Sequence, residues 1–168
     1  MNTKTAHMGL LLAFALILSY IESLIPFSFG VPGIKLGLAN LSVLICLYLI
    51  GCRQALYLTV SKAVICGFLF GSLSVILYSL AGSLLSFLIM AVMAGSGRFH
   101  LPVISAAGGV MHNMGQVIVA YLVIRTYGIW YYVPVLILAG LAAGAVNGIL
   151  AALVMPYLKK AVWRKGNL

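Results

Sequence analysis

The stretch from residue 19 to residue 41 brings together the residue types of this chain that are best suited to binding a small molecule. It contains the only carboxylate of the sequence, Glu22, and also Lys35 and Asn40. Two prolines and three glycines lie between Glu22 and Asn40, where they fix or loosen the backbone. We therefore expect a shaped connection between two apolar segments. It serves either as a small-molecule site or lid, or as a plain interfacial turn.

Lys62 lies near the middle of an apolar segment and needs a partner there. A lysine at bilayer depth is costly unless it pairs or reaches water. Glu22 is the only candidate anion in the chain. Lys62 therefore either forms a structural pair with Glu22 or contacts an anionic ligand.

Four more polar residues fall inside apolar segments, namely His112, Asn113, Gln116 and Asn147. His112 and Gln116 are four residues apart and share one face of a helix. Together with the polar residues above, this group is predicted to line a cavity open to the outer side. His112 can instead be a hydrogen-bonded packing residue, and Asn147 lies beside a ladder of glycines at intervals of four, where it joins helices or contacts a ligand.

The composition indicates an all-α integral membrane protein. Of the 168 residues, 64% are hydrophobic and only 7% are charged, whereas a soluble domain carries roughly 25% charged residues. The apolar runs are long and continuous, which favours helices over strands. We expect one membrane domain, 1–168, that forms a six-helix bundle. The predicted helices are about 8–25, 36–51, 54–72, 73–95, 102–124 and 134–157.

The positive charges predict the orientation of the bundle. The net charge is +9, but the cations are dispersed beside apolar runs. We therefore expect contact with membrane lipids and no nucleic-acid partner. Six spans place Lys4, Arg53, Arg98 and the cations of the tail on one side, against Lys35 and Arg125 on the other. By the positive-inside rule both termini are cytoplasmic. The first apolar segment has no cleavage site after it and is interpreted as an uncleaved span.

Several kinds of chemistry lack their residues. There is no Walker A sequence, and a single carboxylate cannot build a two-acid hydrolytic pair or a magnesium cluster. Three scattered histidines offer no pair for haem or zinc, and the three cysteines are interpreted as buried apolar residues. We therefore expect a protein that is not an enzyme and that has no cofactor and no metal site.

Gly9 and Ala13 form a small-xxx-small pair in the first apolar segment. Residues four apart lie on one face of a helix, and small side chains there allow another helix to approach closely. The pattern predicts either internal packing or a docking face for a partner.

The segment PGIKLGLANL, residues 32–41, follows a first helix that ends in SYIE. In these residues, and in the His112–Asn113 region and the glycine-rich last span, the chain resembles the Gx transporter family, also called heptaprenyl diphosphate synthase component I. That family is similar to the substrate-binding S components of energy-coupling factor transporters. The resemblance implies a six-helix bundle with cytoplasmic termini and a ligand in its outer half, covered by the connection between the first two helices.

The resemblance also implies partners and a role. S components pair with a coupling transmembrane protein and two ATPases, and Gly9-xxx-Ala13 stands where they carry an Ala-xxx-Ala docking face. The leading hypothesis is a bacterial inner-membrane subunit that binds a vitamin or cofactor precursor, with a flavin-, quinone- or isoprenoid-related ligand. Lys35 would gate or contact this ligand. The other predicted site residues are Glu22, Asn40, Lys62, His112, Asn113, Gln116 and Asn147.

Two other hypotheses stay open. The first is a non-catalytic accessory subunit of polyprenyl diphosphate or quinone synthesis, or of flavin-based extracellular electron transfer, which predicts a lateral groove facing lipid. Prenyl diphosphate synthases carry aspartate-rich motifs, and this chain has no aspartate. The second is a structural scaffold without a cavity.

Overall fold

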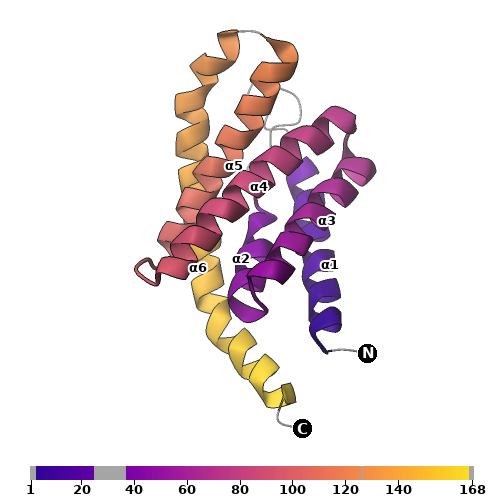
Figure 1. The fold of residues 1–168 in the computed structure, drawn as a ribbon, viewed down its shortest axis with the longest axis vertical. Coiled ribbons are helices and arrows are strands. Elements are labelled where there is room, and N and C mark those ends of the chain that lie inside the picture. The colour runs from indigo at the N-terminus through magenta and orange to yellow at the C-terminus, as the bar shows by residue number, and fades with distance from the viewer. Residues whose placement is uncertain (1–2, 25–36, 126, 167–168) are drawn as a thin grey trace.

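The computed structural model of the chain describes residues 3–24, 37–125 and 127–166, and these residues are almost entirely helical. They form six α-helices and one short 3-10 helix, η1 (Figure 1). The elements are α1 (Thr3–Leu24), α2 (Asn40–Leu49), α3 (Cys52–Phe70), α4 (Leu73–Ser96), α5 (Leu101–Ile124), η1 (Tyr127–Tyr132) and α6 (Val133–Gly166). No strand occurs in this part of the chain, and the all-α membrane class is confirmed.

The helix ends follow local sequence signals. Ser72 caps α4, since its hydroxyl accepts a hydrogen bond from the backbone N–H of Val75 at 3.5 Å. Gly97 ends the same helix in the left-handed conformation, with φ of 66°. Pro102 lies in the first turn of α5. Backbone N–H groups there have no acceptor within the helix, so the proline costs no hydrogen bond.

Within the part of the chain that the structure describes, four helices are long and apolar enough to cross a membrane. They are Thr5–Leu24, Leu73–Ser96, Leu101–Ile124 and Tyr127–Ala161. The third helix, α3, has 19 residues, but Arg53, Gln54 and Lys62 lower its hydropathy. The predicted span 36–51 contains the ten-residue helix α2, which is about 15 Å long, or half of a hydrocarbon core of about 30 Å. The number of six membrane crossings therefore stays a prediction.

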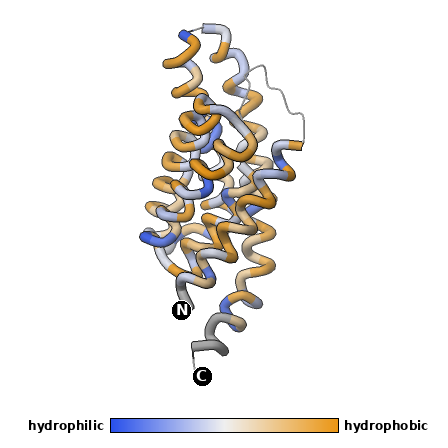
Figure 2. The backbone as a smooth tube through the Cα atoms, turned by 90° about the vertical axis from the view of Figure 1, so that its right-hand side faces the viewer, coloured by the Kyte–Doolittle hydropathy of each residue, from blue (hydrophilic) through white to orange (hydrophobic). Residues whose placement is uncertain are grey.

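Helix α2 lies at the centre of the bundle and contacts each of the other five α-helices. Seven of its ten residues, Asn40 to Cys46, are buried. Both described ends of the chain lie at the same end of the molecule (Figures 1 and 2), which we call the terminal end. The other end carries η1.

Helices α5 and α6 pack backbone against backbone along a line of glycines. A Cβ added at Gly140 would lie 2.7 Å from the carbonyl oxygen of Gly109, and one added at Gly148 would lie 2.9 Å from that of Leu101. Such close approach is possible only without side chains. The glycine ladder predicted from the sequence thus joins α6 to α5.

Two apolar clusters fill the bundle, one toward each end. The cluster at the terminal end contains Leu44, Cys46 and Met90, and the cluster at the η1 end contains Val117 and Leu136. Along α4, α5 and α6 the buried polar residues fall between these two clusters. The interior is therefore layered, with polar side chains in the middle.

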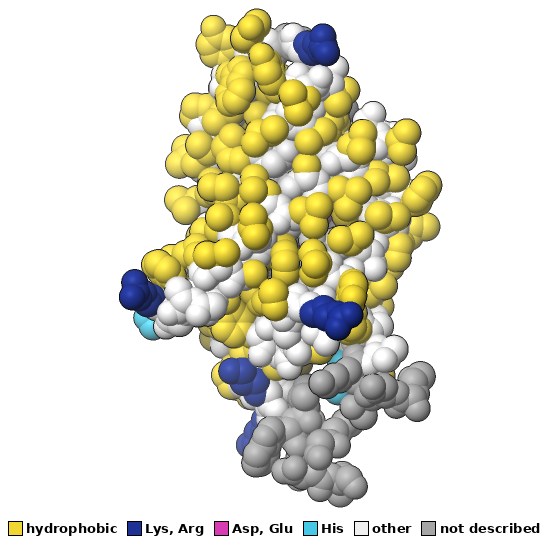
Figure 3. Space-filling view, in the orientation of Figure 1, with side chains coloured by type: hydrophobic (Ala, Val, Ile, Leu, Met, Phe, Trp, Pro, Cys, Tyr) yellow, Lys and Arg dark blue, Asp and Glu magenta, His cyan; other side chains and the backbone are white. Residues whose placement is uncertain are grey.

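The outside of the bundle is apolar on the face that Figure 3 shows, where hydrophobic side chains cover the length of the helices. Lys and Arg side chains gather toward the terminal end, and one lies at the opposite end. Such a distribution suits a protein surrounded by lipid.

Candidate functional site

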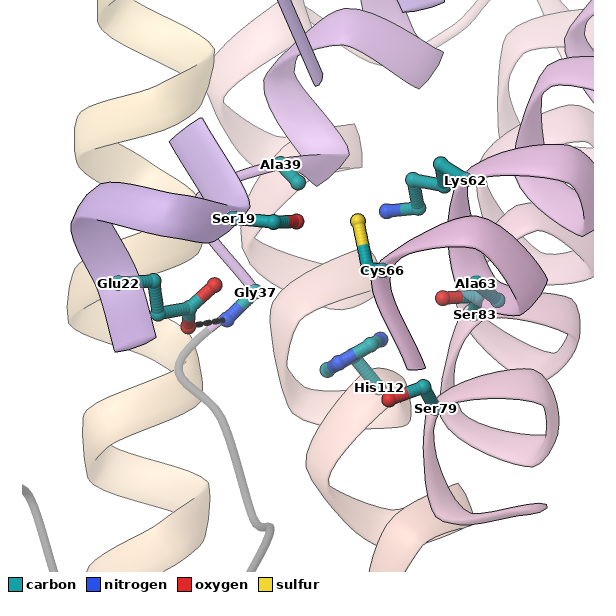
Figure 4. A pocket seen from close by; sticks show the side chains of 10 residues that line it. All are labelled: Ser19, Glu22, Gly37, Ala39, Lys62, Ala63, Cys66, Ser79, Ser83 and His112. Atoms are coloured by element: carbon teal, nitrogen blue, oxygen red, sulfur yellow. Dashed lines mark hydrogen bonds between the residues drawn. The ribbon is translucent and has the colours of Figure 1, made fainter. Parts of the chain in front are cut away.

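The middle layer contains a small cavity lined by side chains from α1, α3, α4 and α5 and by the turn before α2 (Figure 4). Its lining consists of Ser19, Glu22, Gly37, Ala39, Lys62, Ala63, Cys66, Ser79, Ser83 and His112. About 20 Å³ is open to the centre of a water molecule, and the free space reaches about 310 Å³ when the part open to the surroundings is included. The closed part suits one water molecule, which needs about 10–15 Å³.

Glu22 lies near the end of α1 and is only 7% exposed. Its Oε1 accepts a hydrogen bond from the backbone N–H of Gly37 at 2.6 Å (Figure 4). Gly37 has a φ of +83°, a conformation that a residue with a side chain rarely adopts. The contact joins α1 to the turn from which α2 starts.

Lys62 is 4% exposed and begins a chain of polar contacts. Its Nζ donates to Oδ1 of Asn40 at 2.6 Å, and Nδ2 of Asn40 donates to the hydroxyl of Ser86 at 3.3 Å. The chain thus runs from α3 through the first residue of α2 to α4. Lys62 and Glu22 line the same cavity, and a direct pair between them stays a prediction.

The ring of His112 lies between two glycines. A Cβ on Gly37 would lie 3.2 Å from Cδ2 of the ring, and one on Gly82 would lie 3.2 Å from Cε1. The absence of side chains at both positions leaves room for the imidazole at the cavity wall.

The remaining predicted residues lie outside the lining. Asn147 donates from Nδ2 to the carbonyl oxygen of Gly37 at 3.3 Å and so borders the cavity.

Asn113 donates to the carbonyl oxygen of Leu136 at 2.7 Å and joins α5 to α6. Gln116 is fully buried beside Gly82 on α4. Lys35 falls outside the described residues.

Gly9 and Ala13 are exposed on the outer surface of α1. A Cβ added at Gly9 would meet no atom within 4 Å. Packing inside the bundle, one of the two interpretations of this pair, therefore does not account for Gly9.

Comparison with known proteins gives one match. The family model described as heptaprenyl diphosphate synthase component I matches residues 11–154, most of the chain. The chain belongs to this family. No curated protein and no solved structure matches it. The family recognised in the sequence is thus confirmed, whereas the likeness to S components stays a prediction.

Several residues that line the cavity of this component I chain were missed in the sequence. They are Ser19 on α1, Cys66 on α3 and Ser79 and Ser83 on α4. Helical spacing could have found them, since Ser19 precedes Glu22 by three residues and Cys66 follows Lys62 by four. The serines at 79, 83 and 86 likewise form one stripe on α4.

The cavity of component I presents side chains that can donate or accept hydrogen bonds. It offers an ammonium group, a carboxylate, an imidazole and hydroxyl groups, which suit a ligand with several hydrogen-bonding atoms. In the described part of the chain no three His, Cys, Asp or Glu residues are grouped so that they could hold a metal ion.

Proposed function

We propose that this chain is the ligand-binding membrane subunit of an importer of the energy-coupling factor type, for a vitamin or cofactor precursor. One observation carries the proposal: the buried ionisable residues Lys62, Glu22 and His112 together line a cavity in the middle layer of the bundle. Ionisable residues at such depth are costly and are retained where they serve a ligand or an ion path.

The volume of the cavity determines what must change in the bundle before a ligand can bind. Ligand pockets commonly measure about 300–1,000 Å³, and the closed part of this cavity is far smaller. A vitamin-sized ligand, flavin-, quinone- or isoprenoid-related, therefore binds only if the helices around the cavity move apart. Lys62, His112, Ser79 and Ser83 are the side chains that would then contact it.

Retention of a small molecule tests this function. Protein purified from bacterial membranes is denatured, and the released compounds are identified by mass spectrometry. We expect one compound to be retained, and the variant Lys62→Met to retain it about ten- to a hundredfold less, because a hydrogen bond to a charged group is lost. Arg53→Met removes an exposed cation from the same helix and is the matched control. If the two variants retain equal amounts, Lys62 does not contact the ligand.

The exposed Gly9/Ala13 face of α1 supports the proposal that a partner protein binds there. In the proposed importer, the Gly9/Ala13 face docks a coupling transmembrane protein, which brings two cytoplasmic ATPases. Leucine at both positions should abolish co-purification with these subunits, whereas Gly95→Leu, at another glycine with open space around it, should not. Normal co-purification of the α1 variant would exclude this docking face.

A second candidate function is favoured by a different observation. An apolar groove of about 340 Å³ lies between α4 and α5, lined by Ala81, Leu84, Leu85, Leu88, Gly115, Ile118 and Val119. A groove of this kind suits a non-catalytic accessory subunit of polyprenyl or quinone synthesis, which the family description also suggests, or of extracellular electron transfer. Cross-linking by a photoreactive prenyl diphosphate at Leu84 or Ile118, lost in Ile118→Trp, would favour this function over import.

A further inference from the structure

Gly37 is held from two sides by side chains that the sequence suggested as ligand contacts. Its N–H donates to Glu22 of α1 at 2.6 Å, and its carbonyl oxygen accepts from Asn147 of α6 at 3.3 Å. Both side chains are buried, at 7% and 4% exposure. Among the described residues, Gly37 thus connects α1 and α6, two helices that are not a contacting pair.

The position of Gly37 determines the position of the cavity wall. Its carbonyl oxygen also accepts from the N–H of Asn40 at 2.9 Å, which begins α2. Asn40 in turn accepts from Nζ of Lys62 at 2.6 Å. Any shift of Gly37 therefore moves Asn40, and with it the acceptor that orients the lysine.

We propose that Glu22 and Asn147 are positioning residues, which clamp Gly37 and thereby fix Lys62 in the cavity, and are not themselves ligand contacts. The role in ligand binding rests on the proposed function, but the clamp can be tested without a ligand. Cys66 provides the means, because its thiol lines the same cavity as Gly37 (Figure 4).

The experiment measures the rate at which N-ethylmaleimide labels Cys66 in a Cys52→Ser background, which removes the exposed thiol. Glu22→Ala, Asn147→Ala and Gly37→Ala should each speed labelling about tenfold, because the wall opens more often. Cys46, fully buried in the apolar cluster at the terminal end, should react no faster, which separates a local opening from general unfolding.

Conservative and combined variants complete the test. Glu22→Gln keeps an acceptor oxygen and should label within about twofold of the parent rate. The double variant Glu22→Ala/Asn147→Ala should label no faster than the quicker single variant, because both act through Gly37. Gly95→Ala is the matched control for Gly37→Ala, since its added Cβ would meet no atom within 4 Å.

Two results would overturn the clamp. One is a parent-like labelling rate in Gly37→Ala, and the other is a Glu22→Gln rate as high as that of Glu22→Ala, which would assign the role to the carboxylate charge. Ligand retention is scored separately on the same preparations. The clamp stands if labelling follows the expected pattern while no compound is retained, and only the import function then fails.

Discussion

The Lys62 ammonium group is held by a neutral side chain in the middle layer of the bundle. Its hydrogen bond to Asn40 is short, at 2.6 Å, and both groups are buried. Charge-assisted hydrogen bonds of this kind are stronger than neutral ones. The loss of Asn40 and the loss of Lys62 therefore need not cost the same stability. Removing the Asn40 amide breaks its hydrogen bonds to both Lys62 and Ser86, whereas removing the lysine ammonium group keeps the bond between Asn40 and Ser86.

We therefore predict that Asn40→Leu destabilises the protein more than Lys62→Met does. The lysine variant should lose about 1–3 kcal/mol and the asparagine variant about 3 kcal/mol or more, since the latter loses the hydrogen bond to the charged ammonium group and the bond to Ser86 together. Thermal unfolding of both proteins in detergent measures the order. A larger loss in Lys62→Met would contradict the prediction.

The sequence allowed part of this site to be predicted. Glu22, Lys62 and His112 stand out because ionisable residues are rare in apolar segments, and all three line the cavity. Asn113 was expected there too, but its amide joins α5 to Leu136 of α6, a contact set by how the helices pack. Ser79 was missed, because a serine in a membrane helix is common and carries no signal by itself.

At the scale of the helices, α5 and α6 form a pair that tolerates no added atoms at its contact. A Cβ at Gly109 would collide with the backbone of Gly140, and one at Gly144 with that of Ser105. Backbone cannot move aside as a flexible side chain can. The two helices must therefore separate if either glycine acquires a side chain.

We predict that Gly109→Ala lowers stability by about 1–3 kcal/mol through overpacking. Gly95→Ala, on the exposed surface of α4, should be neutral or stabilising by up to about 1 kcal/mol, because alanine is the better helix former. The midpoints of thermal unfolding of the two variants give the comparison. Equal midpoints would show that α5 and α6 separate without cost.

The helices themselves follow from the apolar pattern, but α2 shows the limit of that pattern. Its apolar run was expected to span 36–51, and within the described part of that range, 37–51, the structure has this helix only from Asn40 to Leu49. Hydropathy reports burial and does not distinguish burial in lipid from burial among five other helices. The ten-residue length depends on Gly37 and Gly51, both with positive φ, which bracket the helix.

At the scale of the whole molecule, the two ends differ in charge. Three cations lie toward the terminal end, namely Arg53 in the first turn of α3, Arg98 between α4 and α5, and Lys159 within the last two turns of α6, whereas Arg125 directly follows α5 near η1. Figure 3 shows the same asymmetry. Positive residues stay on the cytoplasmic side, so the terminal end is proposed to face the cytoplasm.

We predict that a cysteine at position 131 is labelled from outside intact bacteria, and that one at position 98 is labelled only after permeabilisation. The three native cysteines are replaced by serine, and a membrane-impermeant maleimide is the reagent. Tyr131 is 87% exposed beside Trp130, so a thiol there is accessible. The reverse pattern would invert the orientation, and labelling of both from outside would exclude an odd number of crossings between them.

The hydrogen bond between Glu22 and Gly37 also bears on how the chain enters the membrane during synthesis. Helix α1 emerges from the ribosome first, with a carboxylate near its end, while the peptide that binds this carboxylate is fifteen residues behind. Until those residues are made, the carboxylate lacks this hydrogen bond, and the translocon or the aqueous boundary must accommodate it. We therefore expect the first helix to complete its insertion only when the second has begun to arrive, so that the two helices form a single unit of biogenesis.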